Sequence, residues 1–479
     1  MPVTTASKNL GDILQYQKDL RCDIVEVDPQ DQSQRRNNDQ QLESAAQSVA
    51  AYLATQGYGP GDCIAIIAVN SLEFIACYLG ILKLGAVAVL ISAKSTHIQI
   101  TDMLKDSAVV FVFTDQLRAI DLPQLDLNKK LQDIPQVDHF ESYQPDESDI
   151  AVILHTSGST GRPKRVLITH HARLSIVATD QVKRKTLSAS PMFHSMGING
   201  VEMNLSSKHD FVFLKYFDAK SYLKTLDSER PDCLVGVPSM FSMLLGESKL
   251  IETLNLSSVR VIVLAGGPTS TTLYNKLKKI FDQSDICIGY GTTETGPKIF
   301  GSHPNLAIPP GSVGYPQPNV SARLVDGVLQ IRNPGMMKGY DDGSHQFTED
   351  GYYITNDLFR IDQNGFYYFV GRSDDMFKSG GNKIFPSEIE QVIETHHNVD
   401  KCVVIPVTDP TKDYKPYAFV TIKENVSVTT DELMLFVADR LARYQRPRQI
   451  WIIESMPLNT VNKIDKNKLK ILAQQNLNI

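Results

Sequence analysis

The residues Thr156 to Lys164 read TSGSTGRPK, a run of glycines and hydroxyl side chains that closes with proline and lysine. Small residues let a backbone approach a polyphosphate, hydroxyl groups donate to its oxygens, and a lysine neutralises its charge. The run stands between two apolar segments, Ile150 to Leu154 and Val166 to Ile168. This arrangement predicts a phosphate loop between two strands, and hence a nucleoside triphosphate as ligand.

Two better-known phosphate loops do not fit this run. The nucleotide-hydrolase pattern GxxxxGK[ST] places its lysine directly after the second glycine, whereas here two residues separate Gly161 from Lys164. The dinucleotide pattern GxGxxG is also missing, because Gly158 and Gly161 have no flanking glycine pair. A flexible surface turn is the alternative interpretation of any stretch rich in serine, glycine and threonine. The ordered run with its terminal Pro-Lys favours the phosphate loop.

The composition of the chain is that of a globular protein. Its 479 residues suggest about two to four packing units. A hydrophobic content of 42%, a charged content of 21% and a mean hydropathy of -0.17 indicate no disordered tract. A net charge of -6 gives no electrostatic reason to expect nucleic acid or acidic membranes as partners.

The sequence also bears on the cellular compartment. The six cysteines are scattered and form neither CxxC pairs nor Cys/His clusters, so we interpret them as buried thiols in a reducing compartment. The first residues lack a signal-peptide profile and the last carry no retention or peroxisomal address. The apolar stretch Phe74 to Ile91 is interrupted by Gly80 and Lys83, which predicts a buried helix that runs into a strand. We expect a cytoplasmic protein without a membrane span.

The pattern of apolar runs predicts the fold class. From Cys63 to about Lys298, short β-rich runs alternate with helical patterns, which is typical of α/β architecture with largely parallel sheets. After Gly311, short strands punctuated by glycine, proline and asparagine indicate a β-rich subdomain. We predict an α/β protein: a large N-terminal domain, residues 1–372, made of two layered α/β subdomains plus the β-rich one, and a small mobile α+β C-terminal domain, residues 373–479.

Element boundaries can be predicted in the C-terminal unit, which has the size of a minimal domain. Its pattern predicts a helix, two strands, a helix and a strand over Pro386 to His396, Val399 to Val407, Tyr417 to Ile422, Thr430 to Leu441 and Ile450 to Ile453. The segment Gln116 to Ser148 is polar and weakly patterned, and we interpret it as a connection.

Seven motifs in order carry a resemblance to a known family. The chain resembles an AMP-forming acyl-CoA synthetase of the adenylate-forming superfamily, which also holds 4-coumarate:CoA ligases, luciferases and the adenylation domains of peptide synthetases. The motifs are TSGSTGRPK (156–164), PMFHSMG (191–197), AGGP (265–268), GYGTTETG (289–296), YYITNDLFR (352–360), GRSDDMFKSGGNKIFPSEIE (371–390) and PLNTVNKID (457–465).

The resemblance implies a two-step reaction. A carboxylic acid attacks the α-phosphorus of ATP, pyrophosphate leaves, and the thiol of CoA then displaces AMP to give acyl-CoA. The implied cofactors are ATP, Mg²⁺ and CoA, or the phosphopantetheine of a carrier protein. One alternative is therefore an acyl-AMP ligase that loads an acyl or peptidyl carrier protein. A second alternative, from another functional class, is a non-catalytic ATP-binding regulator.

The resemblance also implies a set of site residues. The expected catalytic residues are Lys463, Thr293, Glu294 and His194. The expected cofactor-binding residues are Thr156, Ser157, Gly158, Ser159, Thr160, Gly161, Lys164, Gly266, Gly267, Pro268, Tyr290, Gly291, Thr292, Asp357, Arg372, Asp374, Lys378, Gly380 and Gly381. The expected metal ligand is Glu294, whose carboxylate supplies the hard oxygen that Mg²⁺ prefers.

Within that set, particular roles follow from the family. Tyr290 is expected to stack on adenine, Asp357 to accept hydrogen bonds from the ribose hydroxyls, and Arg372 to reach the ribose or a phosphate. Thr293 is expected to bind the α-phosphate, and Lys463 to bridge this phosphate and the acid. Taken singly, Tyr290 could be a packed aromatic at a strand end, Asp357 a turn residue, and Lys463 part of a solvated basic tail.

The hinge region adds a moving part. In the family the C-terminal domain swings between an adenylating and a thioester-forming orientation about an Asp or Lys, which Asp374 matches. The run KSGGNK, Lys378 to Lys383, would then present Gly380 and Gly381 beside the pantetheine tunnel, where side chains would obstruct it. An ordinary tight turn is the alternative for Gly-Gly-Asn.

Three glycines of the family pattern are replaced in this chain. Asn356 and Asn462 are mild replacements, because asparagine adopts left-handed backbone geometry more readily than most residues. Arg165 follows Pro-Lys where glycine is usual, and the sequence assigns it no purpose. Every charged catalytic position is retained, which argues against an inactive homologue.

The acyl-pocket motif bears on the acid. Amino-acid-activating relatives place an aspartate after the phenylalanine of this motif, whereas Phe193 is followed here by His194. The resemblance therefore implies an acid with an uncharged tail, aliphatic or aryl. The expected wall of its pocket is His194, Met196, Val237, Pro238 and Gly266. A satisfied core histidine is the alternative for His194.

Overall fold

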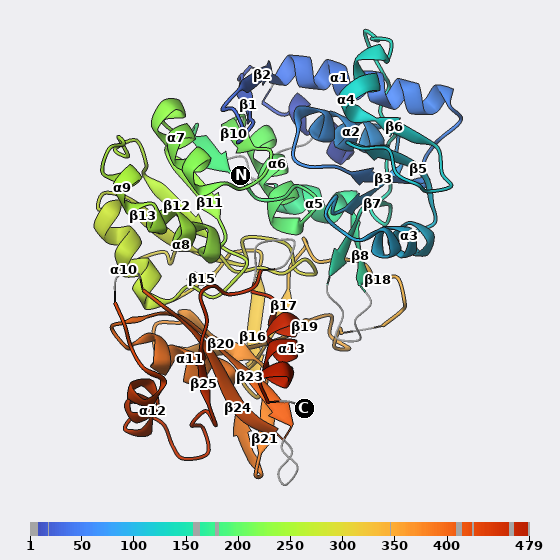
Figure 1. Cartoon of the computed structure of the whole chain (residues 1–479). Helices are drawn as coiled ribbons and strands as arrows, with labels where there is room; N and C mark the ends of the chain where they lie inside the picture. The colour runs from blue at the N-terminus through green and yellow to red at the C-terminus, as the bar shows by residue number, and fades with distance from the viewer. Residues whose placement is uncertain are drawn as a thin grey trace.

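Figure 1 shows the computed structural model, which describes residues 8–17, 19–156, 163–177, 182–344, 346–408, 414–423, 426–458 and 464–477. Helix-flanked sheets form the N-terminal part, in blue to green, and a smaller unit in orange and red forms the C-terminal part. The predicted α/β fold with a large N-terminal and a small C-terminal domain is confirmed.

One sheet carries the predicted phosphate loop. Its strands are β3 (Cys63–Ile67), β4 (Val87–Ile91), β5 (Val109–Thr114), β6 (Gln124–Asp126), β7 (Ile150–Thr156), β8 (Lys164–Thr169) and β18 (Gly339–Tyr340). They follow the order β18-β8-β7-β4-β3-β5-β6, in which β8 pairs antiparallel with β7 and β18 and the other pairs are parallel. Because β7 ends at Thr156 and β8 begins at Lys164, the predicted position of the loop between two strands is confirmed.

Capping residues stand at the start of two longer helices in this part of the chain. The helical segments are η1 (Leu10–Gln15), α1 (Asp39–Thr55), α2 (Leu72–Lys83), α3 (His97–Asp106), α4 (Leu127–Lys130) and η2 (Leu131–Asp133). Asn38 begins α1 and Thr96 begins α3 with capping boxes, in which the side chains of Gln41 and Gln99 bond back to the caps. The predicted helix-to-strand segment is α2 followed by β4, and both are buried. The segment interpreted as a connection contains β6, α4 and η2.

A second sheet precedes three more of the predicted motifs in the chain. Its strands are β1 (Asp23–Val27), β2 (Gln34–Asn38), β9 (Lys185–Ser188), β10 (Asp210–Leu214), β11 (Cys233–Gly236), β12 (Val261–Leu264) and β13 (Asp285–Ile288), in the order β13-β12-β11-β9-β10-β1-β2. Its pairs are parallel except β1 with β2. Helices of this region are α5 (His170–Ile176), α6 (Ser195–Ser206), α7 (Ala219–Glu229), α8 (Pro238–Gly246), α9 (Ser248–Ile251) and α10 (Thr271–Ile280).

The carboxyl ends of neighbouring strands in this sheet deliver the motifs. PMFHSMG follows β9, AGGP follows β12 and GYGTTETG follows β13, while Val237 and Pro238 follow β11. Because β9, β11, β12 and β13 are adjacent and parallel, these segments emerge at one edge of the sheet. Ligands of open α/β sheets bind at such an edge.

A buried ionic cluster ties three helices of the N-terminal domain together. Glu202 of α6 accepts hydrogen bonds from Tyr78 Oη of α2 at 2.5 Å and from Arg173 Nε of α5 at 3.1 Å. The Arg173 guanidinium also pairs with Glu202 Oε2 at 2.6 Å. Because α5 follows the phosphate-loop hairpin and α6 begins in the acyl-pocket motif, this cluster fixes the two motifs relative to each other.

The remaining elements form the β-rich part and the C-terminal unit. The β-rich strands are β14 (Phe300–Gly301), β15 (Tyr315–Pro316), β16 (Ser321–Val325), β17 (Val328–Arg332), β19 (Tyr353–Ile361) and β20 (Tyr367–Arg372). The C-terminal unit contains β21 (Phe377–Ser379), β22 (Asn382–Ile384), α11 (Pro386–Glu394), β23 (Val399–Thr408), β24 (Tyr414–Ile422), α12 (Thr430–Ala438), β25 (Ile450–Ile452) and α13 (Lys466–Leu477). The helices and strands predicted for this unit are confirmed, with ends that differ by a few residues.

The final helix, α13, was not among the predicted elements. Its lysines suggest a solvated tail, but Leu469 and Ala473, four residues apart, are fully buried. They pack with Val403, Ile405 and Phe419 on one face of the sheet formed by β23, β24 and β25. The narrow apolar stripe is enough for docking, because the sheet supplies most of the apolar surface.

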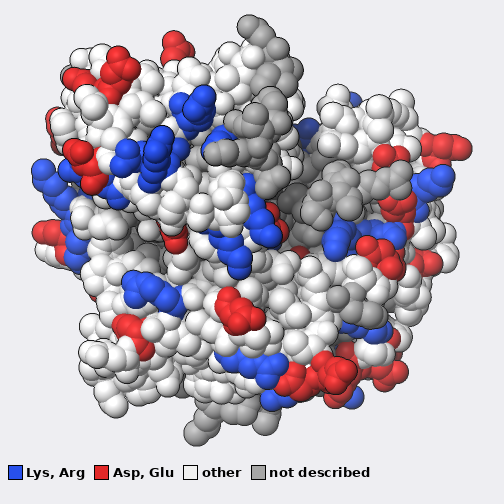
Figure 2. Space-filling model, turned by 90° about the horizontal axis from the view of Figure 1, so that it is seen from below, with Lys and Arg blue, Asp and Glu red and all other residues white. Residues whose placement is uncertain are grey.

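Charged side chains of both signs lie on the surface (Figure 2). Figure 2 shows Lys and Arg side chains interspersed with Asp and Glu over the face seen from below. Among the described residues, none of the helices combines the length and the apolar character that crossing a bilayer requires.

Candidate active site

A chain of hydrogen bonds joins the adenylate motif to the predicted hinge. Tyr290 donates its hydroxyl proton to Asp357 Oδ2 at 2.6 Å. Arg372 donates from Nη1 to Asp357 Oδ1 at 3.2 Å, and from Nε and Nη2 to the two carboxylate oxygens of Asp374, each at 2.7 Å. The structure therefore brings together Tyr290, Asp357, Arg372 and Asp374, four of the predicted site residues.

The strands explain why Asp357 faces inward. Buried and partly buried positions alternate along β19, so Thr355, Asp357 and Phe359 share the inner face. Asp357 is 4% exposed and pairs directly with Arg372 of β20. Burial raises the pKa of Asp357 to about 6, although the Arg372 charge and the Tyr290 hydrogen bond oppose this shift. A carboxyl group with such a pKa changes charge just below neutral pH.

The ring of Tyr290 packs at the end of β13, among aromatic side chains. Its centroid lies 5.0 Å from that of Phe359, edge to face, and 5.8 Å from that of Phe300. This position matches the alternative interpretation of Tyr290 as a packed aromatic at a strand end. Packing on these sides fixes the orientation of the ring, which adenine stacking also requires.

The turn after Tyr290 is held by its own threonines. Thr292 and Thr295 exchange hydrogen bonds, since the backbone N–H of each donates to the hydroxyl oxygen of the other. A Cβ at Gly291 would collide with the carbonyl oxygen of Gly296. Thr293 and Glu294 lie within this closed turn and are partly exposed. The glycine and threonine pattern of the motif thus has a conformational reason as well as a chemical one.

Tyr340 links the end of the phosphate loop to the adenylate motif. The ammonium group of Lys164 lies 4.6 Å from the centroid of the Tyr340 ring, within cation–π range. The Tyr340 hydroxyl donates to Glu294 Oε1 at 2.9 Å and lies 3.0 Å from the hydroxyl of Tyr353. Tyr353 in turn donates to Gln346 Oε1 at 2.8 Å. Sequence reasoning missed Tyr340 and Gln346, which lie outside the quoted motifs.

The donor groups near Glu294 fit a magnesium ion bound together with phosphates. The described residues contain no group of three or more His, Cys, Asp or Glu side chains arranged to hold a metal. Mg²⁺ is commonly held by one or two carboxylates while phosphate oxygens and water complete its shell. A lone Glu294, oriented by Tyr340 and close to the Lys164 side of the site, meets that requirement.

Some predicted residues fall outside the part of the chain that the structure describes. The ends of the phosphate loop are described, and Thr156 pairs with Lys164 across the hairpin. The predictions that lie outside the described residues are those for Ser157, Gly158, Ser159, Thr160, Gly161, Asn462 and Lys463.

Arg165 now has a structural partner. Its guanidinium forms an ion pair with the carboxylate of Asp341, and its carbonyl oxygen accepts a hydrogen bond from Asp341 N at 3.2 Å. Asp341 directly follows β18, which pairs with β8. The sequence could not supply this purpose, because the partner lies 176 positions away.

The segments at the carboxyl edge of the second sheet contain residues that were predicted to line the acid pocket. Met196 packs against the apolar cluster that contains Val237. Pro238 Cδ lies 3.8 Å from the position that a Cβ on Gly267 would take. Gly266 has a φ of +80°, which favours glycine. Met196, Val237, Pro238 and Gly266 therefore come from segments that meet at this edge, while Gly267 and Pro268 of AGGP are exposed beside them.

His194 has a structural function at the start of α6. Its Nδ1 accepts a hydrogen bond from Met196 N at 3.4 Å, so the imidazole caps the helix. Gly197 packs against Pro191, where a Cβ would overlap the carbonyl group. The hydrogen bond gives His194 a structural role, but the residue is partly exposed and is not a core histidine, and its catalytic role stays a prediction.

Asn70 was missed by sequence reasoning and holds the acyl-pocket motif in place. Its side chain accepts from Met192 N at 2.8 Å and donates to the carbonyl oxygens of Ser190 and Leu214 at 3.1 and 3.0 Å. Asn70 is 4% exposed, and these bonds span the junction of the two large sheets. An asparagine after a strand gives no sequence signal for such distant partners.

The Gly-Gly pair of the hinge region is a hairpin turn. Lys378 lies on β21, which pairs with β22, and the loop between these strands consists of Gly380 and Gly381. Their φ values are +56° and +82°, as a two-residue hairpin loop with left-handed residues requires. The tight-turn interpretation is confirmed, and the position of these glycines at a pantetheine tunnel stays a prediction.

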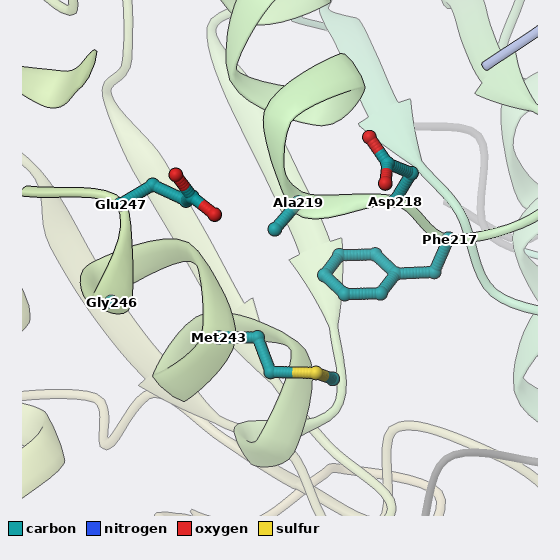
Figure 3. Close-up of a pocket in the computed structure, with 6 residues that line it drawn as sticks. All are labelled: Phe217, Asp218, Ala219, Met243, Gly246 and Glu247. Carbon is teal, nitrogen blue, oxygen red and sulfur yellow. The ribbon is translucent and has the colours of Figure 1, made fainter. Parts of the chain in front are cut away.

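A cavity elsewhere in the N-terminal domain does not contain the predicted residues. It has a volume of about 410 Å³ and lies between the start of α7 and the end of α8. Figure 3 shows the side chains of Phe217 and Met243 projecting toward this space, with Glu247 at its α8 side. Its described lining includes none of the motif residues.

Comparisons with known proteins agree with this geometry. The AMP-binding enzyme model matches residues 22–341, and the AMP-binding enzyme C-terminal domain model matches residues 388–463. A 2-succinylbenzoate–CoA ligase of Geobacillus sp. (strain WCH70) is 29% identical and covers 91% of this chain and 93% of its own. A long-chain-fatty-acid–CoA ligase of Bacillus subtilis (strain 168) is 26% identical, with 88% of each chain covered.

Solved structures show the same fold. ATP-bound MatB from Rhodopseudomonas palustris superposes with a TM-score of 0.87 and 23% identity over 98% of this chain and 99% of its own. The anthranilate CoA ligase AuaEII with anthranoyl-AMP superposes with a TM-score of 0.86 and 24% identity over 98% of both chains. Because the first family model alone spans more than half of the sequence, this chain belongs to the AMP-binding enzyme family, as an AMP-forming acid–thiol ligase.

Proposed function

We propose that this ligase converts a carboxylic acid into its CoA thioester through an acyl adenylate. The observation that supports the proposal most strongly is the contact of Tyr340 with both Lys164 and Glu294. It joins the end of the phosphate loop to the proposed metal ligand, and the two together would face one triphosphate. ATP and a carboxylic acid are the substrates of the first step.

In the first step a carboxylate oxygen of the acid attacks the α-phosphorus of ATP. A new O–P bond forms, the bond to the β-phosphate oxygen breaks, and pyrophosphate leaves. Lys164 would neutralise the phosphates, Thr293 would donate to the α-phosphate, and Glu294 would orient Mg²⁺, which offsets phosphate charge when bound. We assign Lys463 to the bridge between acid and α-phosphate, where one positive charge strongly stabilises the developing oxyanion.

In the second step the thiol of CoA attacks the acyl carbon. The C–S bond forms, the C–O bond to AMP breaks, and the thiol proton is released. We propose that residues 373–479 turn relative to residues 1–372 between the steps, about Asp374. The hydrogen bonds of Arg372 support this assignment. Arg372 bonds both to Asp357, the proposed ribose ligand, and to Asp374, the proposed pivot.

The acid that fits this site has an apolar body. Met196 and Val237 bring apolar surface to the proposed pocket, and Phe193 is followed by His194, where amino-acid-activating enzymes carry an acidic residue. Two of the relatives are named as CoA ligases of 2-succinylbenzoate and of long-chain fatty acids. We propose an aryl or aliphatic acid, and a cytoplasmic enzyme whose six cysteines, all in described parts of the chain, form no disulfide.

Pyrophosphate release tests this function. The purified protein is mixed with ATP, Mg²⁺ and a panel of aryl and aliphatic acids, and CoA or a phosphopantetheinylated carrier protein is then added as acceptor. Pyrophosphate release followed by an acyl-CoA product supports the proposal. An acyl group found only on the carrier protein identifies the acyl-AMP ligase alternative instead. ATP binding without release for any acid identifies a regulator.

A further inference from the structure

The two-residue strand β18 places Tyr340 beside Lys164. Gly339 pairs with Leu167 and Tyr340 with Val166, in antiparallel register on β8. Backbone bonds at its ends run from Lys338 N to Leu167 O at 2.8 Å and from Asp341 N to Arg165 O at 3.2 Å. So short a pairing has little backbone energy to specify its register, and side chains must contribute.

The register decides which face of β8 Tyr340 reaches. Side chains alternate along a strand, so Lys164 and Val166 share one face, and Arg165 points to the other. Tyr340 stands opposite Val166 and therefore diagonal to Lys164, within reach of an aromatic ring. A slip of one residue would turn the Tyr340 ring away from Lys164 and its hydroxyl away from Glu294.

Arg165 and Asp341 occupy the next position of the same register. Asp341 stands opposite Arg165, and their side chains form an ion pair. The Arg165 side chain is 20% exposed and that of Asp341 39%, so the pair is partly shielded from water. Directly opposed charges of opposite sign favour one register of an antiparallel pair over its neighbours. The arginine stands where the family pattern has glycine, which has no side chain to form such a pair.

We propose that Arg165 is a positioning residue for ATP: its pairing with Asp341 fixes β18 in register and so holds Tyr340 against Lys164 and Glu294. The inference rests on the proposed function of Lys164 and Glu294 at the triphosphate. Arg165 itself would not touch the nucleotide, and it acts through Tyr340.

The test measures ATP affinity and turnover in Arg165→Gln and Arg165→Gly. Loss of the ion pair that fixes the register should raise the dissociation constant and the KM for ATP by up to about five-fold. Thioester formation from a supplied acyl adenylate, which needs no triphosphate, should be unchanged. Arg323→Gln is the matched control. Arg323 lies on β16, outside the proposed site, and forms an ion pair with Asp350 at 2.7 Å. Thermal unfolding confirms that each variant is folded.

A double-mutant cycle distinguishes positioning from a general structural effect. Tyr340→Leu removes both the ring and the hydroxyl, and Arg165→Gln combined with it should weaken ATP binding no further than Tyr340→Leu alone. The exchanged pair Arg165→Asp with Asp341→Arg should recover much of the lost affinity. Additive losses in the cycle, or unchanged ATP affinity in Arg165→Gln, would overturn the inference.

The same measurements keep this inference separate from the proposed function. Wild-type protein that binds ATP but releases no pyrophosphate would contradict the proposed reaction, while a weaker Arg165→Gln complex would still support the positioning role. Wild-type protein that binds no ATP would overturn both. Normal turnover in the wild type and in every Arg165 variant would overturn the positioning role alone.

Discussion

The hydroxyl of Tyr290 lies 2.6 Å from Oδ2 of Asp357, although the residues are 67 positions apart. This bond connects the residue proposed to stack on adenine with the residue proposed to bind ribose. It also lowers the pKa of Asp357, against the larger effect of burial that raises it to about 6. The protonation of Asp357 thus depends on its hydrogen bond from Tyr290.

The first prediction concerns pH. Ionised Asp357 accepts hydrogen bonds from ribose hydroxyls, and the protonated form accepts them less well, so the KM for ATP should rise as pH falls through about 6. Tyr290→Phe removes a hydrogen bond that favours the carboxylate, so the midpoint should move upward by up to about one pH unit. KM measured from pH 5 to 8 checks this shift.

The control for this shift is Tyr367→Phe. The Tyr367 hydroxyl donates to the carbonyl oxygen of Ala322 at 3.2 Å in the same β-rich region, and its loss should leave the midpoint in place. Comparing variants also cancels the titration of ATP itself. A Tyr290→Phe midpoint equal to or below that of the wild type would contradict the proposed coupling.

The second prediction concerns Lys463. Lys463→Ala should lower acyl-AMP formation by at least about a hundred-fold, because it removes the charge aimed at the developing oxyanion. Thioester formation from a supplied acyl adenylate should be retained. Lys470→Ala, an exposed lysine of the same basic segment, is the control for charge loss. Equal loss in both half-reactions would refute the role.

The third prediction concerns the hinge. Asp374→Pro fixes φ near −65° at the proposed pivot, so adenylation should proceed while thioester formation stops. Asp374→Asn weakens the ion pair with Arg372 but leaves the backbone free to rotate. It therefore distinguishes the effect of losing the ion pair from the effect of losing the rotation. Overall turnover of Asp374→Pro equal to that of the wild type would remove Asp374 as the pivot.

The fourth prediction concerns stability. Asn356 has a φ of +59°, where a β-branched side chain is strained. Asn356→Val should lower the free energy of unfolding by about 1–2 kcal/mol, while Asn356→Gly should stay within about 0.5 kcal/mol of the wild type. Urea unfolding measures both. A valine variant as stable as the glycine variant would show that this backbone conformation is not retained.

Much of this architecture could be predicted because its signals are local. Several strands of the two large sheets, such as β3, β4 and β12, are continuous apolar runs, and α2 carries both a capping serine and a long apolar run. The left-handed conformation expected for Asn356 is confirmed for the same reason, since it depends on the residue and its neighbours. The motifs AGGP and GYGTTETG likewise follow strands directly, as their positions after apolar runs in the sequence indicate.

The features that sequence reasoning missed depend on distant partners. A two-residue strand such as β18 has no periodicity, so neither its pairing with β8 nor the contact of Tyr340 with Glu294 could be derived. Arg165 lacked a purpose for the same reason, because Asp341 meets it only in the folded chain. In α13, Leu469 and Ala473 are buried, but the neighbouring lysines in the sequence obscure this short apolar pattern.

The arrangement of motifs at the carboxyl ends of β9, β11, β12 and β13 has a consequence for how such an enzyme diversifies. Each of these strands places at least one apolar side chain in or against the core of this sheet, while the segment that follows it carries residues of the proposed site. Exchange of the loops after β9 and β11 would alter the choice of acid, and the nucleotide loops after β12 and β13 would stay intact. The scaffold thus allows the acid to change while the adenylation reaction is kept.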